Sequence, residues 1–119
     1  MSQGKKNDQN KPRLDLIPIE FTIGVAKPLT LGVTKYGEHN FRQGMKFSRL
    51  LAAAKRHIDL ELAGIKADKD SGYEHWMNAA ASLAMYAFMK THRPDMDDRF
   101  KYTDEQLTLI EKLMYGDGE

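Results

Sequence analysis

The chain has 119 residues, of which 41% are apolar, enough for one modest hydrophobic core and too few for two. Its 18 basic and 17 acidic residues nearly cancel, so composition offers no electrostatic case for binding duplex nucleic acid or an anionic membrane. The absence of cysteine excludes disulfides and thiolate metal sites, and no apolar run resembles a bilayer span or a signal peptide, so we expect a cytoplasmic protein.

Residues 1–10 are polar and show no periodicity, so we expect a flexible tail, followed by a single α-helical domain over residues 11–119. Residues 11–18 read Lys-Pro-Arg-Leu-Asp-Leu-Ile-Pro, an extended and proline-bounded strip. If this strip crosses a cleft, Lys11 and Arg13 could contact an anionic ligand. The alternative is an ordinary packed arm held by its leucines and isoleucine.

The first helix is predicted over residues 18–36, because Pro18 suits a first helical position and Phe21 and Leu29 belong to an apolar face. Pro28 lacks a backbone donor and should interrupt the helix near Lys27. We therefore expect two short pieces, 18–27 and 28–36.

The loop over residues 34–44 is dense in donors, acceptors and aromatic surface. Lys35 and Arg42 could hold phosphate, and Tyr36 or Phe41 could stack on a nucleotide base. The segment contains no phosphate-binding glycine motif, and a solvated helix end that terminates at Gly37 explains it equally well.

The second helix is predicted from Ser48, a typical capping residue, to Gly64. Its predicted buried side comprises Leu51, Ala54, Ile58, Leu62 and Ile65. His57 and Glu61 are four residues apart and share a face beside that stripe. Such a pair indicates either a site or an ordinary surface or interior contact.

The third helix is predicted from about Gly72 to Met89, with Ser71 and Glu74 forming a capping box at its start. It is apolar almost all round, which predicts a central and enclosed helix. A polar stripe nevertheless runs along it, formed by His75, Asn78, Ser82 and Tyr86. Buried polar groups need partners, which here are other side chains, waters, a metal or a nucleotide.

The short loop between the second and third helices makes them antiparallel neighbours, so the pair His57 and Glu61 should face the pair His75 and Asn78. Asp68 lies in that loop, near the start of the third helix. A last helix is predicted from a capping box at Thr103 to Gly116 and suits a lid or a dimer contact. No alternating pattern indicates strands, so the predicted fold class is all-α, a compact helical bundle.

Three groups of residues together resemble a known family. They are Gly4 with residues 11–18; Lys35-Tyr36-Gly37-x-x-Asn40-Phe41-Arg42-x-Gly44; and Arg56-His57 with Asp68-x-x-Ser71-Gly72-x-x-His75. Across about residues 10–90 the chain resembles the dATP/dGTP diphosphohydrolase amino-terminal family, which includes MazZ-like phage enzymes. The resemblance implies an α-helical fold similar to the MazG-like nucleotide pyrophosphohydrolases, usually oligomeric, with a divalent metal at the active site.

The resemblance has to meet the chemistry that such enzymes use. MazG-like enzymes hold Mg²⁺ with paired acidic residues, E-x-x-E on one helix and E-x-x-D on the next, because this cation prefers oxygen ligands. Here the third helix offers His75 and Asn78 where acids would stand. Imidazole suits Mn²⁺, Co²⁺, Ni²⁺ or Zn²⁺ better than Mg²⁺. Either the metal is therefore not Mg²⁺, or the histidines act as general acids or donate hydrogen bonds to phosphate.

The leading hypothesis is a metal-dependent pyrophosphohydrolase of purine (deoxy)nucleoside triphosphates, converting dGTP or dATP to the monophosphate and pyrophosphate. The expected cofactor is Mg²⁺ or Mn²⁺, with Co²⁺, Ni²⁺ or Zn²⁺ as alternatives. The protein would be a homo-oligomer, in the host cytoplasm if a phage encodes it. The predicted metal ligands are His57, Glu61, Asp68, His75 and Asn78, of which His57, Glu61 and His75 are also the predicted catalytic residues. The predicted substrate-binding residues are Lys11, Arg13, Lys35, Tyr36, Asn40 and Arg42.

Two other functions stay open at this point. The missing acid quartet favours a non-catalytic nucleotide-binding phage protein that sequesters a nucleotide or regulates a partner. An HD-like dNTP phosphohydrolase is the second, but it needs adjacent His and Asp on one helix. The chain has His57-Ile58-Asp59, which places the two side chains about 200° apart on a helix and argues against it.

Overall fold

The regular structure is entirely helical in the part of the chain that the structure describes. The computed structural model describes residues 4–7 and 9–116, and its elements are η1 (Leu14–Leu16), α1 (Ile19–Tyr36), η2 (Asn40–Gln43), α2 (Phe47–Leu62), α3 (His75–His92), η3 (Pro94–Met96) and α4 (Asp104–Tyr115). Within that part of the chain there is no strand, only an isolated bridge between Ala67 and Glu74. The all-α prediction is confirmed. Of the predicted tail, residues 1–3 and 8 lie outside the described residues, and the remainder is exposed and non-helical.

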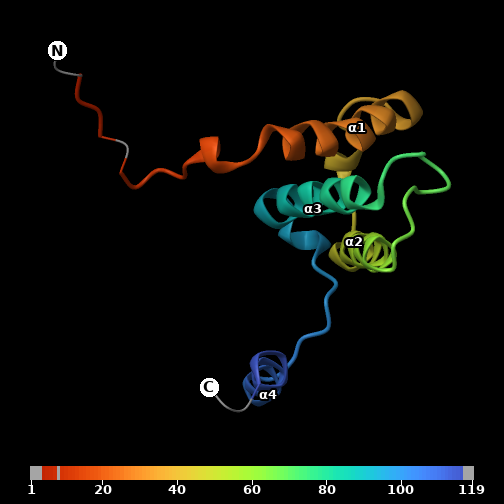
Figure 1. Ribbon diagram of the computed structural model, residues 1–119. Helices are drawn as coiled ribbons and strands as arrows, with labels where there is room; N and C mark the ends of the chain where they lie inside the picture. Colours follow the sequence, from red (N-terminus) through yellow and green to blue (C-terminus); the bar gives the residue numbers. More distant parts are fainter. Residues whose placement is uncertain (1–3, 8, 117–119) are drawn as a thin grey trace.

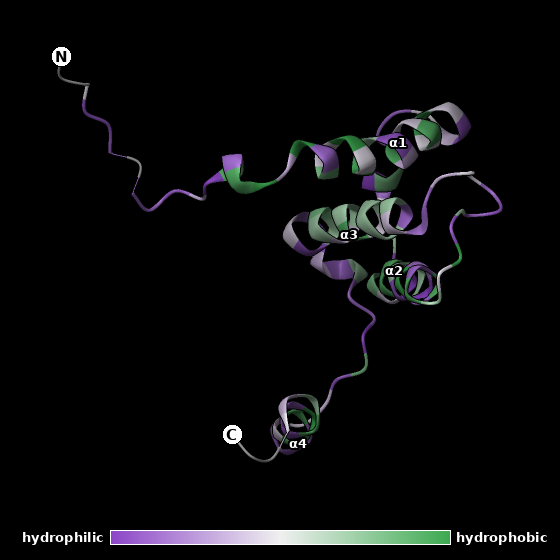
Figure 2. Ribbon diagram, viewed as in Figure 1, coloured by the Kyte–Doolittle hydropathy of each residue, from purple (hydrophilic) through white to green (hydrophobic). Residues whose placement is uncertain are grey.

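Helix α3 lies between α1 and α2, and most of the contacts between helices are made with it (Figure 1). Figure 2 shows mostly apolar colours along α3, as expected for a helix with neighbours on two sides. The amino-terminal arm and α4 extend away from these three helices (Figure 1). The radius of gyration is accordingly 18.3 Å, against roughly 14 Å for a fully compact chain of this length. No described helix is both long enough and apolar enough to cross a membrane.

The hydrophobic core forms where α2 packs on α3. Its buried members are Phe47, Leu50 and Met89, and the half-buried side chains around them include Phe41, Met45, Met85, Tyr86, Phe88 and Met96. The rings of Phe47 and Tyr86 meet edge to face, with centroids 5.1 Å apart. This aromatic contact is one of those that hold this face of α2 against α3.

Only part of the predicted buried face of α2 is confirmed, since Ala54 is buried and Leu51 is half-buried. Phe47, Leu50, Ala54 and His57 are buried, whereas Ile58 is 49% exposed and Leu62 is 85% exposed. The helix carries two apolar stripes, and the stripe that begins with Phe47 packs on α3. The spacing of three, four and three residues then brings His57 into the interior on the same face.

Helix α1 is continuous, so the prediction of two pieces divided near Lys27 was wrong. Pro28 removes only one backbone donor, and the half-buried stretch that contains Pro28 and Leu29 packs toward α3. Earlier in the helix, the buried Gly24 touches the Trp76 ring, which would lie 2.1 Å from a Cβ at that position. A residue without a side chain is therefore required at this helix crossing.

Two predicted helix starts were wrong, because their caps come from distant segments. Ser48 lies inside the first turn of α2, and its N–H and hydroxyl both donate to the Asp98 carboxylate, the N–H over 2.8 Å. Helix α3 begins at His75 without the Ser71–Glu74 capping box, and Glu61 of α2 accepts the Trp76 N–H instead. Sequence-local rules see only caps formed by neighbouring residues.

The two local signals at α4 and α1 are confirmed. Thr103 and Gln106 form a reciprocal capping box, in which the Thr103 N–H donates to the Gln106 side chain over 2.9 Å. Helix α1 ends at Tyr36, and Gly37 follows it with a φ of 91°, a conformation that favours glycine. Helix α4 ends before Gly116 in the same way, as predicted.

Candidate functional site

The turn between α2 and α3 holds Asp68 in a fixed position. The Asp68 N–H donates to the Tyr73 carbonyl over 2.8 Å, and the Gly72 N–H donates to the Asp68 carbonyl over 2.9 Å. One oxygen of the Asp68 carboxylate accepts the N–H groups of Asp70 and Ser71, at 3.2 and 2.9 Å. The carboxylate is thus anchored to its own turn, as is typical of aspartate in such loops.

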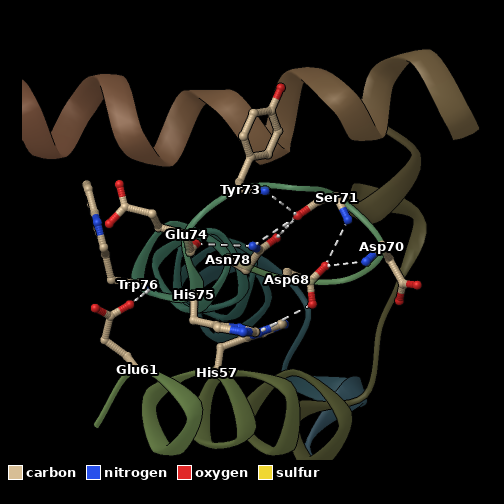
Figure 3. A network of polar contacts seen from close by, with 10 residues as sticks. All are labelled: His57, Glu61, Asp68, Asp70, Ser71, Tyr73, Glu74, His75, Trp76 and Asn78. Atoms are coloured by element: carbon tan, nitrogen blue, oxygen red, sulfur yellow. Dashed lines mark hydrogen bonds and ion pairs between the residues drawn. The ribbon is translucent and has the colours of Figure 1, made fainter. Parts of the chain in front are cut away.

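The second oxygen of that carboxylate faces two buried histidines (Figure 3). His57 comes from α2 and His75 from the first turn of α3, and their Nδ1 atoms are 3.0 Å apart. The Asp68 oxygen lies 4.0 Å from the Nδ1 of His57. One ligand atom from each of the three residues lies within 4.8 Å of the others, and we call this group the His–Asp–His cluster.

Burial and charge favour the neutral form of His57 and the ionised form of Asp68. His57 is 8% exposed, and burial lowers its pKa, helped by the nearby Arg56 and His75, although Asp68 acts to raise it. Burial alone would raise the pKa of Asp68, but hydrogen bonds from Ser71 and the proximity of His57 outweigh it, so that pKa lies below its ordinary value. A neutral imidazole and a carboxylate are the forms that bind a metal ion.

Two of the five predicted metal ligands lie outside the cluster. A carboxylate oxygen of Glu61 accepts the Trp76 N–H over 2.9 Å at the start of α3. The Asn78 amide donates to the Ser71 hydroxyl and to the Glu74 carbonyl, each over 3.2 Å (Figure 3). Both side chains therefore hold the turn and the helix start together around the cluster.

A cavity of about 540 Å³ opens beside the cluster, between the second half of α1, the loop that follows it, and α3. Its lining includes His57, Asp68 and Asn78 on one side. The opposite side presents the four predicted substrate-binding residues of the loop, namely Lys35, Tyr36, Asn40 and Arg42. The volume is in the range of small-molecule sites in proteins.

The arm does not reach this cavity in the described structure. Arg13 pairs with Asp15 over 2.7 Å, and both side chains are exposed. Neither Lys11 nor Arg13 belongs to the cavity lining. Helix α1 separates the arm from the loop, and its 18 residues span about 27 Å.

The two loop aromatics differ in what they can offer a ligand. The Arg42 guanidinium lies over the Phe41 ring, 4.7 Å from its centroid, and Phe88 meets the same ring edge to face. The exposed ring of Tyr36 is the free aromatic surface of the two. Phe41 thus belongs to the packing that holds the loop in place.

Sequence reasoning did not assign Gly32, Ala81 or Met85 to the site, although all three line the cavity. Ser82 also lines it and had appeared only as part of the polar stripe. A glycine in the middle of a helix was the one available signal, because glycine is unfavourable there unless space is needed.

Comparisons with known proteins give a consistent result. Residues 1–99 match the family model described as "dATP/dGTP diphosphohydrolase, N-terminal". The chain is also 42% identical over 97 residues to a protein of Salmonella phage PMBT28 named "dATP/dGTP diphosphohydrolase". That alignment covers 81% of this chain and 33% of the relative, so the chain spans about a third of the relative's length. No solved structure matches it.

Proposed function

The chain belongs to the dATP/dGTP diphosphohydrolase amino-terminal family, and from that premise we propose that it hydrolyses purine deoxynucleoside triphosphates. The proposed reaction adds water across the anhydride bond between the α- and β-phosphates and yields the monophosphate and pyrophosphate. One observation carries the proposal: a single cavity has His57 and Asp68 of the His–Asp–His cluster in its lining on one side, and Lys35 and Arg42 on the other.

The donor atoms of the cluster fit a divalent metal. Metal–nitrogen bonds of about 2.1 Å place neighbouring nitrogen ligands roughly 3 Å apart, and the two histidine nitrogens are 3.0 Å apart. Two imidazoles and one carboxylate favour Mn²⁺, Co²⁺, Ni²⁺ or Zn²⁺ over Mg²⁺. We propose His57, Asp68 and His75 as the ligands. When bound, the ion supplies positive charge to phosphate oxygens and makes a water molecule more acidic.

The protein's own groups position the triphosphate. Lys35 and Arg42 line the cavity and neutralise phosphate charge, and Asn40 offers an amide to the sugar or base. Asp68 keeps its hydrogen bonds to the turn through one oxygen, which leaves the other directed at the cluster. The Asp68 carboxylate is in place before a substrate enters, and such preorganisation lowers the cost of binding.

A non-catalytic nucleotide-binding protein is the second candidate function. The cluster contains one carboxylate rather than the two pairs of the MazG-like enzymes, and Glu61 is engaged at the start of α3. The HD-like alternative has no such support, because Asp59 pairs with Lys55 over 3.4 Å on the exposed side of α2.

The test is to incubate the protein with each dNTP and NTP, with Mg²⁺, Mn²⁺, Co²⁺ or EDTA, and to separate the products by ion exchange. Monophosphate plus pyrophosphate, formed from dGTP or dATP and abolished by EDTA, is the expected result. Nucleoside plus triphosphate would instead indicate the HD-like reaction. Nucleotide that binds but stays intact with each of the metals would indicate the non-catalytic nucleotide-binding protein.

We also propose that the protein is a homo-oligomer. Large apolar side chains stay exposed on three helices, for example Ile19 (73%) on α1, Leu62 (85%) on α2 and Leu113 (76%) on α4. Exposed apolar surface on this scale suits an interface between copies. Light scattering coupled to size-exclusion chromatography should report a multimer at micromolar concentration, and a monomer would contradict this part of the proposal.

A further inference from the structure

The cavity is lined in part by small residues. Gly32 of α1 belongs to its lining on one side, and Ala81 and Ser82 of α3 belong to it on the other. Leu29 and Met85 add apolar surface to the same cavity. These five residues are thus apolar, apart from the Ser82 hydroxyl.

Gly32 is the central member of the α1 wall. At 100° per residue, its direction lies in the middle of the α1 positions that line the cavity, which are Pro28, Leu29, Leu31, Val33, Lys35 and Tyr36. A Cβ built at Gly32 meets no heavy atom within 4 Å. A side chain at this position would therefore extend into the cavity.

The two glycines of α1 have different reasons to be glycine. At Gly24, a Cβ would come within 2.1 Å of the Trp76 ring, so packing alone excludes any side chain. Packing places no such limit at Gly32. Alanine is more favourable than glycine inside a helix, so Gly32 lowers the stability of α1. The visible effect of a missing side chain at this position is that the cavity stays open.

Ser82 supplies a second and independent observation. It is 6% exposed, lies on the cavity wall, and its hydroxyl makes no hydrogen bond to any of the described residues. No fully buried side-chain oxygen or nitrogen of the described residues lacks a partner, so this hydroxyl is accessible from the cavity, where a ligand can form a hydrogen bond with it. Ser82 follows His75 by seven residues, which places it roughly 10 Å farther along α3 from the cluster. That separation suits a nucleotide with its phosphates at the cluster and its base beside Ser82.

We propose that Gly32, Ala81 and Ser82 form the compartment for the purine base, with Gly32 as the residue that sets its size and the Ser82 hydroxyl as a contact to the edge of the base. This inference rests on the proposed function for the nature of the ligand, a purine nucleotide. It places the base between α1 and α3 rather than on Phe41, whose ring is already covered by Arg42.

The experiment measures binding of the α,β-methylene analogues of dATP and dGTP, and of inorganic tripolyphosphate, all with Mn²⁺. Gly32→Leu should weaken binding of both analogues at least tenfold and leave tripolyphosphate binding within about twofold. Gly32→Ala should weaken binding of both analogues to a smaller extent, and again more than it weakens tripolyphosphate binding. The matched control is Ala26→Leu, an exposed position of the same helix outside the cavity lining.

Folding does not confound Gly32→Ala, because this substitution adds one methyl group to open space and improves helix propensity. Its melting temperature should equal or exceed that of the wild type. Ser82→Ala should change the ratio of the dATP-analogue and dGTP-analogue affinities by about three- to tenfold, a readout that a purely structural serine would not move.

The outcomes separate this inference from the proposed function. Analogue binding that is unchanged in folded Gly32→Leu overturns the base compartment even if the wild type releases pyrophosphate. An equal loss of tripolyphosphate binding also overturns it, because the compartment would then hold phosphate. A wild type that binds the analogues, loses them on Gly32→Leu, and hydrolyses no dNTP supports the compartment and overturns the catalytic proposal. A wild type that binds no probe overturns both.

Discussion

The two walls of the cavity are built in opposite ways. The wall from α2, α3 and their connecting turn is held by hydrogen bonds among His57, His75, Asp68, Ser71 and Asn78. The wall from the end of α1 and its loop presents Lys35 and Tyr36, whose side chains are exposed and make no hydrogen bond within the described part of the chain. The hydrogen-bonded wall is therefore ordered before a ligand binds, whereas Lys35 and Tyr36 in the exposed wall can gain hydrogen-bond partners only from a ligand.

This difference tells which properties each wall controls. A change in the hydrogen-bonded wall removes both a chemical group and a structural contact, so it should alter stability and activity together. A change in the exposed wall should alter ligand binding and leave the free energy of unfolding unchanged. The predictions below test this division, from the largest expected effect to the smallest.

His75→Ala should have the largest effect. It removes one member of the cluster and leaves the buried His57 without its partner, so turnover of dGTP and dATP and binding of Mn²⁺ should fall below detection. The loss should come with a destabilisation of about 1–3 kcal/mol, because the His75 side chain is only 3% exposed. Product assays, Mn²⁺ titration calorimetry and thermal melts measure the three quantities.

The matched control for that variant is His92→Ala, which removes an exposed imidazole at the end of α3, outside the cavity lining. It should leave turnover and Mn²⁺ affinity at wild-type values. Full activity in a folded His75→Ala protein would remove the cluster from the mechanism.

Asp68→Asn should separate the structural role of the hydrogen-bonded wall from its role in metal binding. An asparagine oxygen still accepts the Asp70 and Ser71 N–H groups, so the free energy of unfolding should change by less than about 1 kcal/mol. Loss of the charge should lower Mn²⁺ affinity by roughly 10- to 100-fold. Asp59→Asn, which changes an exposed carboxylate on α2, is the control and should have neither effect. Unaltered Mn²⁺ affinity in Asp68→Asn would contradict the assignment of Asp68 as a ligand.

Lys35→Met tests the exposed wall. The substitution keeps the aliphatic stem and removes a charge from the cavity, so the dissociation constant for the dATP analogue should rise by roughly 5- to 10-fold at low salt. The rise should shrink as ionic strength increases, and the melting temperature should stay constant. Lys27→Met, on the same helix outside the lining, should bind like the wild type. A large stability loss in Lys35→Met would show that this wall is also held by internal contacts.

Much of the fold was accessible from the sequence because its signals are local. The all-α class, the capping box at Thr103 and the helix end at Gly37 each depend on residues within a few positions of one another. The approach of His57, Asp68 and His75 also followed, since a short loop makes α2 and α3 antiparallel neighbours.

The wrong predictions share a physical cause. In each case the local sequence allows more than one arrangement, and contacts with distant residues decide which one forms. Helix α2 has two apolar stripes, and contacts with distant residues, such as Phe47 against Tyr86 of α3, accompany the burial of one of them. Ser48 looked like a cap, but the capping carboxylate is Asp98, fifty residues later. The role of Gly32 depends on the empty space in front of it, which no local pattern contains.

Glu61 is the residue for which sequence and structure lead to different expectations, and its variants give the smallest predicted effect. As a metal ligand it should tolerate no loss of charge, whereas as the acceptor for the Trp76 N–H at the start of α3 it needs only an oxygen. The structure therefore predicts wild-type Mn²⁺ affinity in Glu61→Gln, and a destabilisation of about 1 kcal/mol in Glu61→Ala, measured by chemical denaturation. Glu74→Ala is the control, because Glu74 stands at the capping position of α3 without a side-chain cap. Mn²⁺ affinity in Glu61→Gln that falls as far as in Asp68→Asn would instead make Glu61 a fourth ligand, and the hydrogen-bonded wall would have to open at the start of α3 to admit the metal.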